Sequence, residues 1–477
     1  MTPIISNRVI NERRSRTATA RLAGRDGAPG FLAPSDDPAR RTRPRTPLSR
    51  RHDSNNDGDN LMPTVLQPER ADPSRPDAGA IDSDRMAAWR LAICLSLGSA
   101  IALGLARFSY ALLLPPMKAD LGWTFAQAGA LNTANAAGYL IGALAFPMLS
   151  RRRRAGTLLA AGCALTALLM AACGFTSDMH TLLVQRLATG VGSALIFISG
   201  GVLAARLASA SPRDAGLLLG LYYGGTGWGI VASSLLVPAT LTHGVHGWQP
   251  AWFALAVACV LFSAMAVSAA RRIERAHAAQ AAPRDGAVPA VTASPARFAL
   301  ALAGYGLFGV GYIGYMTFIV ALLRGAGMSG TVVSAFYVML GIATVVSARL
   351  WSRLLDRMRG GQALAVLNAL LGIATLMPAI FVHPAAAFAS GVLFGATFLS
   401  AVASTTAFVR HNLPPDGWAK GISAFTTVFA FGQIAGPVAI GWVSDSAGLA
   451  RGLVYSALTL FAGAALAAGQ RALRTSA

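Results

Sequence analysis

The sequence has little charge and almost no lysine. Asp, Glu, Lys and Arg make up 13% of its 477 residues, about half the share of an average soluble domain. Lys118 and Lys420 are its only lysines, and neither ends a glycine-rich turn of the kind that cradles nucleotide phosphates. The 4 cysteines lie singly in apolar runs. These absences argue against a soluble protein, ATP-driven chemistry, a disulfide framework and a zinc site.

Acidic residues are missing from the interior of every long apolar run. After residue 85 the acids occur only in loops or near the ends of runs: Asp120, Asp178, Asp214, Glu274, Asp285, Asp356, Asp416 and Asp445. Membrane proton relays commonly use an embedded carboxylate or histidine. The runs offer neither, so coupling through a run-end acid, coupling through a protonated substrate and uncoupled transport all stay open.

Long apolar runs fill the chain from residue 89 onward. Each is about 20 residues long, the length that crosses a bilayer as an α-helix. Backbone polar groups must be paired inside lipid, so the runs must be helical. The sequence predicts an all-α membrane protein with twelve transmembrane helices at 91–114, 125–149, 155–175, 181–205, 215–239, 250–270, 298–323, 331–355, 362–382, 385–409, 418–443 and 450–470.

Arginine is concentrated in alternate loops. One set of loops and the C-terminal end carry eighteen basic residues, and the other set carries only Lys118, Arg324 and Arg451. Basic loops face the cytoplasm, so both termini are expected there. Four parts are expected, namely a disordered Arg/Pro-rich tail (1–85), an N-terminal six-helix half (86–270), a central cytoplasmic loop (271–297) and a C-terminal six-helix half (298–477). Translation starting at Met86 stays open as an alternative.

The two halves repeat one another. A gapless shift of 205 residues pairs Gly104 with Gly309 and aligns the basic turn at 152–156 with the turn at 357–361. Six spans is an even number, so both halves cross the membrane in the same direction. The sequence therefore predicts two parallel six-helix repeats.

Several motifs resemble those of the major facilitator superfamily of secondary transporters. The turn around Asp356 and Arg357 is similar to its Asp-Arg loop signature, and residues 186–194 and 432–441 are similar to its glycine-rich elements. The runs 104–115 and 128–139 resemble its YbfB/YjiJ-like branch, a bacterial inner-membrane group. The resemblance covers residues 86–477 and implies alternating access by the fold of that superfamily. It implies gating or conformational roles for Arg152, Arg154, Asp356, Arg357, Arg359, Gly432, Gly436 and Pro437, although the N-terminal turn lacks the expected acid.

Two arginines stand inside predicted spans, where topology does not require them. Arg107, Arg186 and Asn132 are expected about 8–10 Å below the outer surface at 1.5 Å per residue. A buried arginine costs at least a few kcal/mol unless it meets water, a partner or a ligand. We therefore expect an anion site. Snorkelling and bonding to helix carbonyls stay open for each arginine. The candidate substrate-binding residues are Arg107, Asn132, Asn135, Tyr139, Arg186, Tyr312 and Gln433.

The sequence as a whole favours a secondary transporter of a small polar, anionic organic solute in the bacterial inner membrane. We expect a monomer in the lipid bilayer without enzymatic activity, cofactor, metal or nucleic-acid partner, with a proton as the candidate coupling ion. Efflux of hydrophobic compounds and a non-transporting sensor or scaffold stay open. The substrate and the direction of transport are not specified by these residues.

Overall fold

The computed structural model describes residues 78–210, 215–280, 295–413 and 415–473, which are helical with short connections and contain no strand. The predicted disordered tail lies outside this part of the chain except at its end, because a helix already begins at Ala78. The middle of the predicted central loop also lies outside it. Nearly all of the described chain is therefore the predicted helical bundle.

The first span is longer than expected and changes its helix type midway. It runs as α1 (Ala78–Ser99), the π-helix η1 (Ala100–Phe108) and α2 (Tyr110–Leu121). At its end Ser109 N donates to Gly104 O at 3.0 Å, the i to i−5 bond of a π-turn. Because the helix continues to Leu121, Arg107 lies about 20 Å from its end rather than the expected 8–10 Å. The apolar run ends at residue 114, so the sequence alone predicted the end of this span too early.

The other predicted spans also correspond to helices. The N-terminal half continues with α3 (Phe125–Arg152), α4 (Ala155–Cys173), α5 (Met179–Ala210), α6 (Ala215–Thr240) and α7 (Gln249–Gln280). The C-terminal half contains η3 (Pro295–Phe298), α8 (Ala299–Gly325), α9 (Gly330–Leu350), α10 (Ser352–Arg357), α11 (Gln362–Ile380), α12 (Pro384–Asn412), α13 (Pro415–Ala447) and α14 (Leu449–Ala468).

Ten helical segments of the described chain are long and apolar enough to cross a membrane. The helices α3 and α6 have spanning length but are not among the ten. The predicted span 331–355 is two helices, because α9 ends at Leu350 and α10 starts at Ser352. The all-helical membrane fold is confirmed, and the count of twelve spans stays a prediction.

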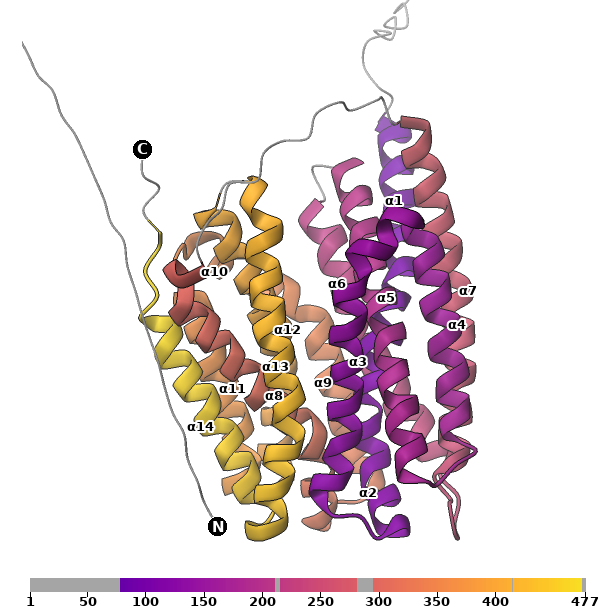
Figure 1. Cartoon of the computed structure of the whole chain (residues 1–477), viewed down its shortest axis with the longest axis vertical. Coiled ribbons are helices and arrows are strands. Elements are labelled where there is room, and N and C mark those ends of the chain that lie inside the picture. The colour runs from indigo at the N-terminus through magenta and orange to yellow at the C-terminus, as the bar shows by residue number, and fades with distance from the viewer. Residues whose placement is uncertain (1–77, 211–214, 281–294, 414, 474–477) are drawn as a thin grey trace, which may run out of the picture. The chain divides into compact units, whose positions relative to one another are not determined.

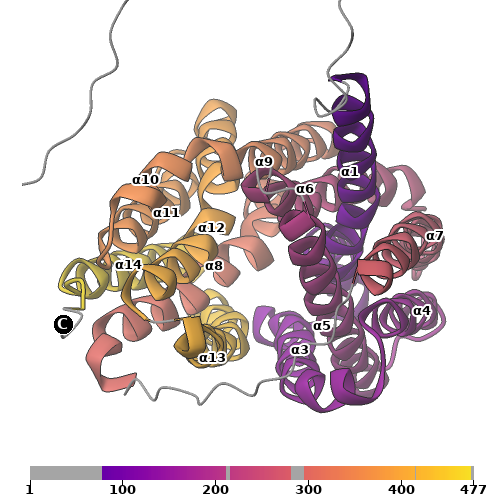
Figure 2. The same ribbon diagram turned by 90° about the horizontal axis from the view of Figure 1, so that it is seen from above.

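The two halves pack in the same way, as the parallel repeat predicts. In the N-terminal half the first span packs on α6, α3 on α5, and α4 on α7; in the C-terminal half α8 packs on α13, α9 on α12, and α11 on α14. Figure 2 shows the resulting two clusters of helices side by side. The equivalent glycines keep the innermost pairs close. A Cβ on Gly104 would collide with the Gly229 backbone of α6, and one on Gly309 would lie 2.7 Å from Phe429 O of α13.

The halves are joined by two helix pairs, α6 with α9 and α3 with α13. We call the α3–α13 pair the seam. Asp445 accepts hydrogen bonds from Phe125 N (2.6 Å) and Ala126 N (2.9 Å), and Thr133 Oγ1 donates to Ile434 O at 2.7 Å. Between these bonds, Gly129 of α3 lies directly against Pro437 of α13. The seam begins at the end of the bundle opposite α10, which lies at the top of Figure 1. We call the end of the bundle where Asp445 meets α3 the closed end, and the opposite end, where α10 lies, the basic end.

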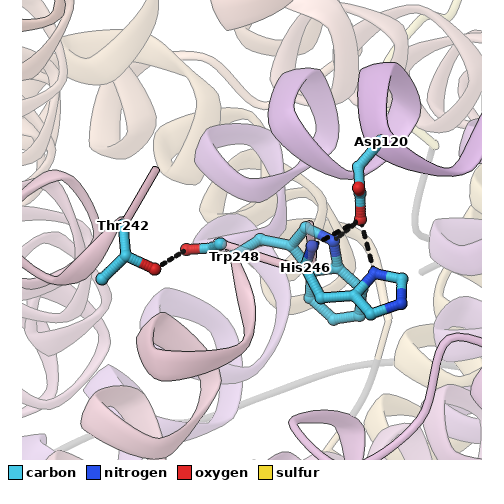
Figure 3. A network of polar contacts seen from close by, with 5 residues as sticks. Asp120, Thr242, His246 and Trp248 are labelled. Atoms are coloured by element: carbon cyan, nitrogen blue, oxygen red, sulfur yellow. Dashed lines mark hydrogen bonds and ion pairs between the residues drawn. The ribbon is translucent and has the colours of Figure 1, made fainter. Parts of the chain in front are cut away.

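A carboxylate fixes a loop at the closed end of the N-terminal half. Asp120 Oδ2 accepts from His246 N (3.1 Å) and Trp248 Nε1 (2.7 Å) and lies 2.6 Å from His246 Nδ1 (Figure 3). His246 has a φ of 57°, an uncommon conformation for a non-glycine residue. These bonds hold the α6–α7 connection against α2.

Candidate functional site

Arg107 is a buried cation without a counter-charge. Its side chain is 2% exposed, and its Nε and Nη2 atoms are buried without a hydrogen-bond partner. No carboxylate pairs with it among the described residues. Arginine keeps its charge at physiological pH, and an unpaired charge in a low-dielectric interior is costly. This arrangement is therefore incomplete without a further group.

The π-helix gives Arg107 its unusual setting. A π-turn widens the helix and breaks the α-helical hydrogen-bond sequence, and such turns occur frequently at functional sites. The next residue, Phe108, packs edge to face on Phe398 of α12 at 5.9 Å, and Phe398 in turn stacks on Tyr312 of α8 at 6.3 Å. Arg107 therefore lies next to a residue that contacts the C-terminal half.

Arg186 is buried in a different environment. It is fully buried on α5, its Nη1 donates to Ala106 O at 2.6 Å, and its guanidinium carbon lies 5.4 Å from the Tyr110 ring and 5.5 Å from the Trp252 ring. Its Nε and Nη2 atoms have no hydrogen-bond partner. Aromatic faces and a carbonyl oxygen partly balance its charge. The two arginines are close enough to interact, but Arg186 faces the interior of the N-terminal half.

The polar residues predicted on one face of α3 bond to two different neighbouring helices. Asn132 Nδ2 donates to Thr317 Oγ1 of α8 at 2.9 Å, across the boundary between halves. Asn135 Nδ2 donates to Arg186 O at 3.2 Å, within the N-terminal half. Both Oδ1 atoms are buried without a partner. Asn132 and Tyr139 thus lie at the interface, whereas Asn135 fixes α3 to α5.

An aromatic layer in the C-terminal half, which the sequence reasoning missed, surrounds Tyr312. The Tyr312 ring is nearly parallel to those of Phe308 (4.8 Å between centroids), Phe429 (5.5 Å) and Phe398 (6.3 Å). Tyr305 also stacks on Phe308 and Phe429. The i, i+3, i+7 spacing of Tyr305, Phe308 and Tyr312 on α8 was the available signal. Gln433 lies buried on the neighbouring α13.

Contacts between the halves lie next to Arg107. Tyr337 of α9 donates a 2.9 Å hydrogen bond to Phe108 O, and the Phe108 ring meets Phe398 edge to face at 5.9 Å. Together with the Asn132–Thr317 bond, these contacts lie on the closed-end side of Arg107. Arg107 therefore lies beside contacts that join the two halves.

The predicted gating residues of the two basic turns are exposed. No described contact joins these two turns across the halves. Arg152, Arg154, Asp356, Arg357 and Arg359 are all exposed. The N-terminal turn is supported by an acid that the motif did not predict, because Glu274 Oε1 of α7 accepts from Gly156 N at 2.8 Å. By contrast, the predicted gating residues of α13 are closely packed. Gly432 and Gly436 lie against α8, and Pro437 lies against Gly129 of α3.

No group of three His, Cys, Asp or Glu residues in the described chain is placed to hold a metal ion. Two packed repeats of membrane-length helices with polar groups between them define the fold of a secondary transporter. Residues 99–469 match the family MFS_4, described as "Uncharacterised MFS-type transporter YbfB". The chain belongs to this family of major facilitator transporters and is a multi-pass membrane protein.

Solved transporters share the fold. A bacterial homologue of the human lysosomal transporter Spinster, inward-facing and unoccupied, is 14% identical over 80% of this chain and 96% of its own, with a TM-score of 0.58. A mutant of the nucleoside transporter NupG is 13% identical over 79% and 99%, with a TM-score of 0.60. No curated protein matches the sequence significantly. At these identities the likeness concerns the fold alone.

Proposed function

We propose that this transporter carries a small anionic organic solute across the bacterial inner membrane by alternating access, with Arg107 as the residue that binds the anion. The observation that carries the proposal is the burial of Arg107 between the halves with two unpaired guanidinium nitrogens. An anion would supply the missing hydrogen bonds and cancel the cost of the charge. A cation would meet repulsion there, which disfavours efflux of cationic compounds.

The second part of the proposal concerns the gate. The α3–α13 seam closes one end, and the basic turns at the other end are exposed, as expected of a transporter open toward the basic end. The arginine-rich loops favour a cytoplasmic position for that end and for both termini. Opening of the opposite side requires α13 to separate from α3 at Pro437 and Asp445.

The remaining predicted residues have supporting positions. Tyr139, Tyr312 and Asn132 line the boundary between the halves beside Arg107, and Gln433 lies on the seam helix. Arg186 and Asn135 act through α5, because Arg186 holds the Ala106 carbonyl next to Arg107. We therefore assign Arg186 a positioning role, with contact to the solute made by Arg107.

The test is a thermal-shift screen of the purified protein against organic anions, amino acids and sugars, followed by counterflow of any ligand in proteoliposomes. A ligand that binds the folded state raises the unfolding temperature. Arg107→Ala should abolish both the shift and counterflow, whereas Arg451→Ala, which removes an exposed arginine of α14, should change neither. Counterflow by Arg107→Ala at the rate of the unmutated protein would refute the assignment.

A further inference from the structure

We infer that the solute is a monoanionic aromatic acid, with its carboxylate on Arg107 and its ring between Tyr139 and Tyr312. This inference rests on the proposed function and narrows its substrate class. Three features carry it: the number of unpaired charges, the chemistry of the side chains around Arg107, and the shortage of free hydrogen-bond donors there.

The charge count favours one carboxylate. Arg107 has neither a carboxylate partner nor a ring beneath its guanidinium among the described contacts, whereas Arg186 has two rings and a carbonyl. Among the described residues, Arg107 is therefore the buried arginine with neither a ring nor a carbonyl to offset its charge. A second carboxylate on the solute would be buried without a partner, which is strongly unfavourable.

Each half contributes a cluster of aromatic side chains. On the C-terminal side, Tyr312 belongs to the stacked layer with Phe308, Phe398 and Phe429. On the N-terminal side, Tyr139 packs near Phe197 at 6.4 Å, and Phe197 packs near Tyr223 at 5.5 Å. Aromatic pairs gain stability beyond their buried area when their rings are offset-stacked or edge to face.

Several of these rings remain partly accessible. Tyr223 is 41% exposed, and Tyr139, Phe197 and Phe429 are only half-buried. The other C-terminal rings are buried and hold Tyr312 in place. A flat ring can therefore add an aromatic contact at one of the accessible rings.

The side-chain amides of Asn132 and Asn135 are not free to bind a solute, which disfavours a sugar or another polyhydroxyl solute. The Nδ2 groups of Asn132 and Asn135 already bond Thr317 and the Arg186 carbonyl. A solute with many hydroxyl groups would lose bonds to water without gaining enough in return. One strong ionic contact and one apolar ring suit the groups that are present.

The experiment measures binding of radiolabelled benzoate to the full-length protein in lipid nanodiscs by equilibrium dialysis, with competition by related compounds. Cyclohexanecarboxylate keeps the charge but loses the aromatic face, and should bind about two- to tenfold more weakly. Benzamide keeps the ring but loses the charge, and should bind more than about tenfold more weakly. Benzene-1,2-dicarboxylate and acetate should also compete poorly.

Variants separate the two contacts. Arg107→Ala should remove benzoate binding. Tyr312→Leu should bring benzoate and cyclohexanecarboxylate to similar affinities, whereas Tyr312→Phe should preserve the preference. Tyr455→Leu, which changes an exposed tyrosine of α14, is the matched control and should have no effect.

The outcomes distinguish the two proposals. Arg107-dependent binding of cyclohexanecarboxylate, acetate or the dicarboxylate with an affinity equal to that of benzoate overturns the aromatic monoanion and leaves the anion transporter in place. Binding that survives in Arg107→Ala, or the absence of binding by every compound, overturns both.

Discussion

The two halves of the bundle share a scaffold but differ in chemistry. The shift that aligns their packing pairs Arg107 with Tyr312 and Arg186 with Gly391, so both buried arginines belong to the N-terminal half. The π-helix also belongs to the first span, whereas its partner α8 is α-helical throughout. Close helix packing can recur in both halves because it does not depend on the substrate. A single anionic group, in contrast, needs only one arginine, which one half can supply. The comparison indicates that the C-terminal half supplies the aromatic wall and the N-terminal half the charge.

The largest expected effect tests the shared scaffold. Gly104→Ala should destabilise the protein by about 3 kcal/mol or more, because its Cβ would meet the Gly229 backbone. Gly309→Ala should cost less, since its nearest neighbour, the carbonyl oxygen of Phe429, would be 2.7 Å away rather than 2.4 Å. Fluorescence-detected size exclusion after heating measures the folded fraction. Gly325→Ala, where a Cβ meets nothing within 4 Å, is the control; equal tolerance at all three sites contradicts the scaffold argument.

The next effect separates the two arginines of the N-terminal half. Arg107→Met should leave the ligand-free protein as stable or up to about 3 kcal/mol more stable, because it removes a buried charge without a partner. Arg186→Met should destabilise it, because the Ala106 carbonyl loses its donor and two rings lose their cation. Thermal unfolding without ligand measures both. If Arg107→Met is the more damaging variant, Arg107 has a structural role that its contacts do not show.

A smaller effect is expected at the seam, where the halves also differ. Both α3 and the repeat-related helix α9 have a cap of their own, Thr124 and Ser329, but the N-terminus of α3 also receives Asp445 from the opposite half. Asp445→Ala should weaken the closed end by about 1–2 kcal/mol, and Ser329→Ala should not alter the balance between conformations. Spin labels on Ala119→Cys and Ser446→Cys, with Cys94 replaced by alanine, report the separation. An unchanged distance distribution in Asp445→Ala would count against the gate.

The smallest effect on stability is expected at the N-terminal caps of two helices that the 205-residue shift aligns. Asp178 caps α5, and His383 caps α12. Hydrogen bonds from Thr181 N and Oγ1 hold the pKa of Asp178 below its usual range, and His383 Nδ1 accepts from Ala385 N at 3.2 Å. Because the pKa of Asp178 is lower in the folded protein, the cap stabilises the protein fully above the pKa of an unfolded carboxyl group, about 3.9. This stabilisation is lost as the pH falls through the lower pKa of the folded state. The protection of the first-turn amides of α5 from hydrogen exchange, expressed relative to the intrinsic exchange rate at each pH, should therefore fall below about pH 4. Asp178→Ala should remove that pH dependence without changing α12.

The sequence predicted the parts of the fold that depend on local pattern. Apolar runs and arginine-rich turns marked the helices and the two halves, because lipid requires long apolar helices with basic residues at one end. The extension of the first span to Leu121 was missed since Pro115, Pro116 and Lys118 end its apolar run, yet the helix continues through them.

The site was only partly predictable for a related reason. Arg107 was identifiable because a charge inside an apolar run is conspicuous. Its π-helical setting and the different surroundings of Arg186 depend on packing that no spacing rule encodes. The bond between Asp445 and α3 joins residues 320 positions apart, so neither position alone shows its partner.

The alignment of the seam has a kinetic consequence. Ile434, Pro437, Gly441 and Asp445 follow one face of α13 and meet α3 at successive levels. Contacts arranged in a line can break one after another as a helix tilts away from its partner. In the proposed alternating-access cycle, the barrier at this seam would then be set by a few contacts at a time.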